Sequence, residues 1–222
     1  MNASPRPRIK ICCIQSLAEA RLAIAAGADA LGLVSAMPSG PGVIADERIA
    51  EIAAAIPPPI ATFLLTSRQS AAAIVEQHRR CRTSTIQLCD ALPDGDYDAL
   101  GAALPAIRLV QVVHVRGPES VDEARRVAPR VDALLLDSGN PALAVKELGG
   151  TGRTHDWGIS ARIAATSWAP VFLAGGLDAG NVRDAIARVR PFAVDVCSGV
   201  RTRGALDEEK LRAFMSAVAA AG

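Results

Sequence analysis

Short runs of β-branched residues and leucine alternate with alanine-rich amphipathic stretches along the whole chain. The first pattern predicts strands that begin near Ile9, Ala30, Ile60, Thr85, Ile107, Asp132, Pro170 and Phe192. Helical spacing of apolar residues predicts helices over 17–26, 46–55, 70–80, 97–103, 120–128, 160–166, 180–188 and 207–220. The sequence therefore predicts successive strand–helix units, which require a parallel sheet.

Eight strand–helix units are enough to close a (β/α)8 barrel, and an open doubly wound sheet is the main alternative. The open sheet usually carries a glycine-rich turn after its first strand, whereas residues 11–15 contain no glycine. No shift in composition marks a linker. We therefore expect an α/β chain with a single (β/α)8 TIM-barrel domain over residues 1–222, in which residues 1–8 form a short N-terminal tail.

Composition limits the partners of this domain. Aromatic residues make up 3% of the chain, so the core is aliphatic and a base-stacking surface for nucleic acid is not expected. The formal net charge of +1 gives no strong attraction to nucleic acid or to an anionic membrane. No uninterrupted apolar stretch is long enough to predict a membrane segment. No heptad pattern or apolar surface stripe indicates an oligomeric state.

Cysteine usage indicates a reducing compartment. The chain has 5 cysteines, of which Cys12 and Cys13 are adjacent and the others lie far apart. No Cys or Cys/His spacing suits zinc, so we expect no metal site. Free thiols are typical of cytoplasmic proteins, and we predict a cytoplasmic location.

Alternation along each strand sorts the side chains that point into the barrel. It places Lys10 and Cys12 inward and Cys13 outward at the end of the first strand. The same alternation directs other polar residues inward near the ends of later strands: Gln87, Asp137 and Asp195. A thiol beside an ammonium group and a carboxyl in the same barrel mouth suggest acid–base catalysis by Cys12 and Asp137. The alternatives are structural, with Cys12 as a buried filler and Asp137 as a hydrogen-bond anchor.

Two further features point to the same end of the barrel. The segment 137–157 is far longer than the usual connection between strand and helix, and long loops of this kind lie at the catalytic rim. Glycines follow the last two strands, as Gly175-Gly176 and as Ser198-Gly199. Barrels often hold a phosphate at these two loops through backbone N–H groups. The sequence therefore predicts a phosphorylated small molecule as the ligand.

The motifs at these positions resemble those of the phosphoribosylanthranilate isomerase family, and the resemblance covers nearly the whole chain. Lys10-Ile11-Cys12 is similar to the opening K-I-C-G of that family, and Gln87-Leu88 to its Q-L-H-G. The ordered matches continue with Leu135-Leu136-Asp137-Ser138, Gly149-Gly150-Thr151-Gly152 with Asp156-Trp157, Ala174-Gly175-Gly176-Leu177 with Asn181-Val182, and Val194-Asp195-Val196 with Ser198-Gly199-Val200.

This resemblance implies a cofactor-free isomerase of tryptophan biosynthesis that performs an Amadori rearrangement. Asp137 would be the general acid that opens the ribose ring, and Cys12 the general base that removes the C2′ proton. Lys10, Gln87 and Asp195 would contact the substrate. Residues Gly150, Thr151 and Gly152 would belong to the active-site loop, and Gly175, Gly176, Ser198 and Gly199 would bind phosphate.

The sequence departs from the family pattern where the aromatic acid is recognised. The family carries P-K-S-x-R-x-I, whose arginine holds the anthranilate carboxylate, whereas this chain has Gly42 at the arginine position. Cys13 replaces the glycine of K-I-C-G, and Cys89-Asp90 replaces the H-G of Q-L-H-G. Candidate substitutes for the missing arginine are Arg116, Arg153, Arg201 and Arg203.

Two other functions compete with the family activity. A diverged relative would perform the same proton transfers on another phosphorylated sugar-like substrate, and a non-catalytic protein would only bind a phosphometabolite. Retention of both Cys12 and Asp137 argues against mere binding, which requires neither residue.

Overall fold

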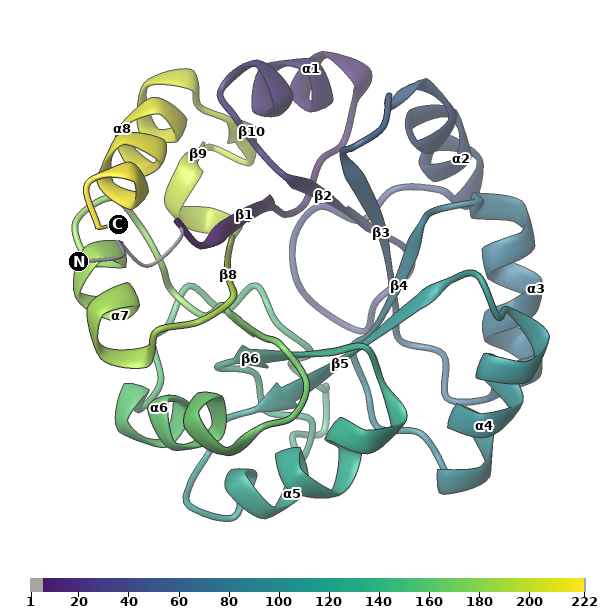
Figure 1. Cartoon of the computed structure of the whole chain (residues 1–222). Helices are drawn as coiled ribbons and strands as arrows, with labels where there is room; N and C mark the ends of the chain where they lie inside the picture. The colour runs from purple at the N-terminus through teal and green to yellow at the C-terminus, as the bar shows by residue number, and fades with distance from the viewer. Residues whose placement is uncertain (1–5, 222) are drawn as a thin grey trace.

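The strands close into a barrel in the computed structural model, which describes residues 6–221 (Figure 1). Each strand pairs in parallel with its neighbours in sequence, and the last pairs with the first. The strands are β1 (Arg8–Ile11), β2 (Ala30–Val34), β3 (Ala61–Thr66), β4 (Thr85–Leu88), β5 (Arg108–His114), β6 (Ala133–Asp137), β7 (Val171–Leu173) and β8 (Ala193–Val196). The predicted (β/α)8 barrel is confirmed, and all predicted strand starts lie within one residue of the observed ones.

Helices follow the strands and form a ring outside the barrel (Figure 1). They are α1 (Leu17–Ala25), α2 (Asp46–Ala55), α3 (Ala71–Cys81), α4 (Asp94–Ala103), α5 (Ser120–Val127), α6 (Trp157–Thr166), α7 (Val182–Val189) and α8 (Glu208–Ala219). Helices α4 and α6 begin three residues before their predicted starts. Helix α6 starts early because the Asp156 carboxylate accepts a hydrogen bond from the Gly158 amide at 2.7 Å, a cap that the apolar pattern does not register.

Short elements after α5 and β8 were not predicted. They are the 3-10 helices η1 (Ala128–Arg130) and η2 (Ser198–Val200) and the hairpin of β9 (Arg201–Thr202) and β10 (Ala205–Leu206). Such elements span too few residues for a periodic pattern to form. Residues 1–5 of the predicted tail lie outside the described residues, and Arg8 already belongs to β1.

The aliphatic core has two parts, separated by the wall of the barrel. Side chains such as Leu134 and Leu136 point outward and pack beneath the helices, whereas Leu135 between them points into the barrel. Phe63 and Phe172 meet inside, with ring centroids 5.8 Å apart. This alternation confirms the predicted inward faces of β4, β6 and β8.

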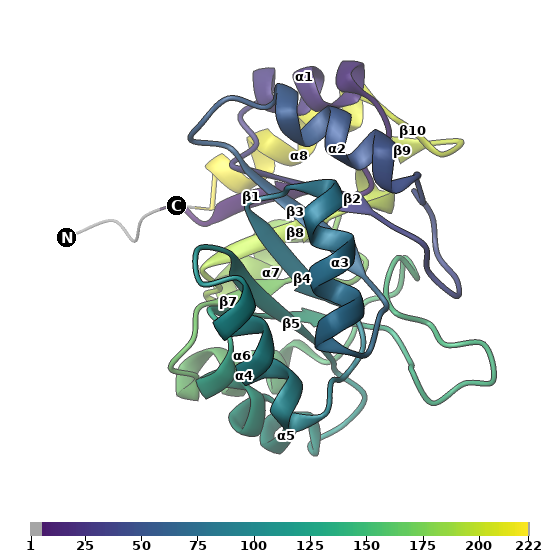
Figure 2. The same cartoon turned by 90° about the vertical axis from the view of Figure 1, so that its right-hand side faces the viewer.

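Two long loops project from the same end of the barrel, after β2 and after β6 (Figure 2). The Ser39 hydroxyl in the first donates to the Lys146 carbonyl in the second at 2.7 Å. The loops also touch where a Cβ on Gly150 would lie only 2.5 Å from Pro41 Cδ. Together they cover one side of the barrel mouth. None of the helices within residues 6–221 has the length and apolar character needed to cross a membrane.

Candidate active site

A cavity of about 680 Å³, its open mouth included, lies at the end of the barrel from which the two loops project. Ten of the predicted site residues line it: Cys12, Gln87, Asp137, Gly150, Thr151, Gly152, Gly175, Gly176, Asp195 and Ser198. Lys10 and Gly199 are not among the lining residues. The structure thus brings most of the predicted residues together around one space.

Lys10 lies beneath the cavity floor, where it is fully buried. The register of β1 and β8 sets Lys10 opposite Asp195, and its Nζ donates to Asp195 Oδ1 at 2.9 Å. Burial alone would lower the pKa of the ammonium group, but attraction to Asp195 and to Cys12 outweighs it and raises the pKa of Lys10. Lys10 therefore stays charged directly below the thiol.

The Cys12 thiol occupies space that a glycine of the neighbouring strand leaves open. A Cβ on Gly32 would lie 2.8 Å from Cys12 Sγ and 3.0 Å from Lys10 Nζ. A hydrogen bond from the Cys13 side chain lowers the pKa of Cys12; burial opposes this shift and the charge of Lys10 assists it. Gly32 was not identified from the sequence, although a glycine within an apolar strand indicates such a close approach.

The prediction that Cys13 points outward is wrong, because Cys13 lines the cavity. Strand β1 ends at Ile11, and Cys13 has a positive φ of 61°, so strand alternation does not extend to it. Its side chain lies within hydrogen-bonding reach of the thiols of Cys12 and Cys197, which raises the pKa of Cys13. Its Cβ also lies against the loop after β2, where a Cβ on Gly42 would be only 2.5 Å away.

Arg201 fixes the backbone at the end of β1 through hydrogen bonds. Its Nη2 donates to the carbonyl oxygens of Cys12 and Cys13, and its Nη1 donates to Glu19 Oε1 at 3.0 Å. The side chain is almost fully buried. Sequence reasoning considered Arg201 only as a substrate contact, since pairing with Glu19 across the chain leaves no local signal.

Asp137 forms another wall of the cavity at the end of β6 and is 8% exposed. Its Oδ1 accepts a hydrogen bond from the Ser138 amide at 2.7 Å. The Ser138 hydroxyl in turn is 2.7 Å from Thr151 Oγ1, which ties the active-site loop to the strand. Gly149 comes so close that a Cβ there would lie 2.6 Å from Asp137 Oδ2. The carboxyl is therefore fixed in direction while it faces the cavity.

The loop after β7 presents backbone N–H groups to the cavity. Gly175 and Gly176 have positive φ values of 81° and 61°, a conformation that glycine adopts without strain. Within the described chain, the amides of Gly175, Gly176 and Leu177 have no hydrogen-bond acceptor. Ser198 faces them from the start of η2. This arrangement suits an anion such as phosphate.

Gly199 does not face the cavity but allows the last two loops to pack. A Cβ at this position would lie 2.0 Å from the Leu177 carbonyl oxygen.

Gln87 does line the cavity, and its buried Oε1 accepts no hydrogen bond from any described residue. It is therefore available to a ligand hydroxyl.

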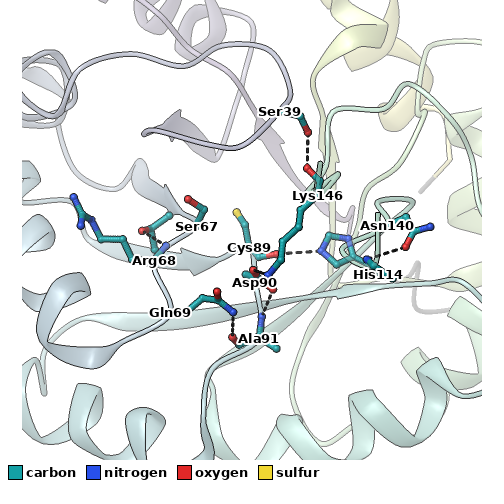
Figure 3. A network of polar contacts seen from close by, with 12 residues as sticks. Ser39, Ser67, Arg68, Gln69, Cys89, Asp90, Ala91, His114, Asn140 and Lys146 are labelled. Carbon is teal, nitrogen blue, oxygen red and sulfur yellow. Dashed lines mark hydrogen bonds and ion pairs between the residues drawn. The ribbon is translucent and has the colours of Figure 1, made fainter. Parts of the chain in front are cut away.

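The end of β4 is joined to the long loop after β6 beside the cavity (Figure 3). Lys146 forms an ion pair with Asp90, and His114 Nε2 lies 3.1 Å from the Cys89 carbonyl oxygen.

Of the four arginines predicted as substitutes for the missing one, none lines the cavity. No group of His, Cys, Asp and Glu within residues 6–221 has the arrangement needed to hold a metal ion.

Known proteins are similar to this chain in sequence and in fold. Residues 9–217 match the family model described as N-(5'phosphoribosyl)anthranilate (PRA) isomerase. The N-(5'-phosphoribosyl)anthranilate isomerase of Geobacter sulfurreducens is 39% identical over 209 residues, which cover 94% of this chain and 96% of the relative. That of Methanocella arvoryzae is 34% identical over 193 residues, 87% of this chain and 88% of the relative. The crystal structure of phosphoribosyl anthranilate isomerase from Thermus thermophilus superposes with a TM-score of 0.80 at 30% identity, covering 96% of this chain and 98% of that one.

Proposed function

Because the chain belongs to the N-(5'-phosphoribosyl)anthranilate isomerase family, we propose that it isomerises N-(5'-phosphoribosyl)anthranilate to the 1-deoxyribulose 5-phosphate ketose in tryptophan biosynthesis. The observation that carries the proposal is that a thiol of lowered pKa and a carboxyl line one cavity, whose rim presents backbone amides with no acceptor among the described residues. The reaction only moves protons, which is what an acid, a base and an anion anchor can do.

Asp137 begins the reaction as the general acid. It protonates the ribose ring oxygen, the bond from that oxygen to C1′ breaks, and the nitrogen lone pair forms a protonated Schiff base. The hydrogen bond from the Ser138 amide and the tether through Thr151 support this role, since they hold the carboxyl in one direction.

Cys12 continues as the general base. Its thiolate removes the C2′ proton, and the electron pair moves toward the positively charged nitrogen to give an enolamine. The enolamine then takes a proton at C1′ while its C2′ hydroxyl gives up a proton, which leaves the C2′ carbonyl of the ketose. Lys10 supports the base from below, because its fixed positive charge favours the thiolate form of Cys12.

The remaining lining residues bind the substrate in this proposal. The amides of Gly175 and Gly176 with Ser198 hold the phosphate, while Gln87 Oε1 accepts a hydrogen bond from a sugar hydroxyl. Asp195 lines the cavity and fixes Lys10, so Lys10 acts through charge rather than through direct contact. Gly199 supports the phosphate loops through their packing.

The proposed site of the reaction is the cytoplasm. All five cysteines are free thiols, and the base can act only while Cys12 stays reduced.

Complementation of a tryptophan auxotroph that lacks this isomerase tests the proposal. We expect the wild-type chain to restore growth without tryptophan, and the purified enzyme to lose about 10²–10⁴-fold in kcat on Cys12→Ser or Asp137→Asn. Failure of the folded wild-type protein both to complement and to isomerise the substrate in vitro would contradict the proposed function. A diverged relative or a non-catalytic binding protein would give that result.

A further inference from the structure

The cavity offers no positively charged side chain to the carboxylate of an anthranilate ring. Among the described residues that line it there is no lysine or arginine, whereas two carboxyl side chains, Asp137 and Asp195, are present. Lys10 lies below the floor of the cavity, where it already forms an ion pair with Asp195. A substrate carboxylate would therefore meet no unpaired cation among the described residues that line the cavity.

Three cations in the loops of this rim are either paired with a carboxylate or directed away from Cys89. Lys146 forms an ion pair with the buried carboxylate of Asp90 (Figure 3). Arg153 forms an ion pair with Glu147 within the same loop. Arg68 directs its guanidinium away from Cys89 (Figure 3). Lys146 and Arg153 would each have to break their ion pair before they could bind the carboxylate of the ligand.

Position 42 is closed to a longer side chain. Gly42 has a φ of 80°, and a Cβ there would lie 2.5 Å from Cys13 Cβ and 3.0 Å from Cys13 Cα. An added side chain would thus strain its own backbone and collide with the end of β1. As long as Cys13 keeps its place, this part of the loop after β2 cannot supply a counter-charge.

An apolar part of the cavity wall comes from β2, β3 and the two long loops. Val34, Met37, Leu65 and Leu148 line it. If the phosphate is held at Gly175 and Gly176, the ring of the substrate extends toward these side chains. This wall recognises a flat hydrophobic ring through burial, which does not depend on a charged substituent.

We infer that the site does not require a charge on the aromatic ring, so that the enzyme also isomerises N-(5'-phosphoribosyl)arylamines with an uncharged ortho substituent. The inference rests on the proposed function and concerns the substrate class of the same cavity. A carboxylate that meets a fixed cation usually gains about tenfold or more in affinity. Here that gain is missing, and a neutral substituent enters without loss of a charged group's hydration.

Two substrates that differ in one group test the inference. Condensing ribose 5-phosphate with anthranilate or with 2-aminobenzamide gives matched aminoaldoses, in which the amide replaces the carboxylate at similar size. Isomerisation in D2O places deuterium at C1′, which ¹H NMR follows, and Cys12→Ser provides the uncatalysed background.

We expect values of kcat/KM for the two substrates that differ by less than tenfold. A preference of tenfold or more for the carboxylate would overturn the inference and leave the proposed function intact. If the folded wild-type protein isomerised neither substrate, the proposed function itself would fail, and the inference would fail with it.

A matched pair of variants at Met37 tests the placement of the ring. Met37→Lys adds a cation to the apolar wall, whereas Met37→Gln changes polarity without charge. We expect Met37→Lys to shift the ratio of kcat/KM values at least tenfold toward the carboxylate substrate, relative to Met37→Gln. Equal ratios in the two variants would overturn the placement of the ring against this wall.

Discussion

The rim at the ends of β7 and β8 and the rim at the ends of β1 and β2 are packed in different ways. At the first rim, backbone meets backbone: a Cβ on Gly176 would lie 2.6 Å from the Arg153 carbonyl carbon, and one on Gly199 would lie 2.0 Å from the Leu177 carbonyl oxygen. At the second rim, a side chain meets a glycine, since Cys13 fills the space that Gly42 leaves open. The backbone contacts of the first rim leave room only for glycine. The contact at the second rim instead depends on which residues stand at positions 13 and 42.

The two rims also differ in how they match the motif pattern described in the sequence analysis. The glycines of the first rim all match that pattern. At the second rim, Cys13 stands where the pattern has glycine, and Gly42 stands where it has arginine. These two departures are in contact with each other, because the Cys13 side chain fills the space beside Gly42.

Arg201 connects the two rims, and its removal should have the largest effect on stability. It follows η2 at the first rim and binds the carbonyl oxygens of Cys12 and Cys13 at the second. Arg201→Ala removes the side-chain donor of these oxygens and the ion-pair partner of the Glu19 carboxylate, which should cost about 3–5 kcal/mol in the free energy of unfolding. Urea-induced unfolding measures this cost.

Arg203→Ala is the control for Arg201→Ala, because Arg203 is exposed in the turn between β9 and β10. We expect it to change the free energy of unfolding by no more than about 0.5 kcal/mol. If both variants were equally stable, Arg201 would not hold the end of β1 in place.

Gly199→Ala tests the backbone contact of the first rim. The added methyl group forces the loops after β7 and β8 apart, which should cost about 1–3 kcal/mol in unfolding and raise KM, because the amides that face the phosphate move. Steady-state kinetics and inhibition by inorganic phosphate measure the effect on binding.

Gly101→Ala is the matched control for this substitution. Gly101 lies in α4 and is exposed, and a Cβ there would meet nothing within 4 Å. Alanine should therefore stabilise the helix by up to about 1 kcal/mol and leave KM unchanged. An unchanged KM in Gly199→Ala would show that the packing of the two loops does not position the phosphate.

The sequence predicted the features that follow from alternation along the strands and from paired glycines in the loops. Alternation placed Lys10, Cys12 and Asp137 inside the barrel, and paired glycines located the rim with free amides. Cys13 was misplaced because its positive φ breaks the alternation, and the pattern of apolar residues carries no sign of that angle. Arg201 depends on contacts between distant segments, so no local motif marks it, whereas Gly32 in its apolar strand is a local sign of close approach.

The smallest expected effect concerns the pH dependence of the base at the second rim. The hydrogen bond from Cys13 stabilises the thiolate of Cys12 and lowers its pKa. A base acts in its deprotonated form, so a lower pKa extends activity toward lower pH. Cys13→Ala removes the donor, and the acidic limb of the profile of kcat/KM against pH should move to higher pH.

Cys13→Ser provides the comparison, because its hydroxyl retains a donor at the same position and keeps the same φ. Its acidic limb should lie nearer to that of the wild type, and iodoacetamide should alkylate Cys12 at lower pH in Cys13→Ser than in Cys13→Ala. Coincident profiles for the wild type and both variants would mean that Lys10 alone sets the pKa of Cys12. The exchange at positions 13 and 42 would then alter only the shape of the second rim, whereas separated profiles would show that it also tunes the base.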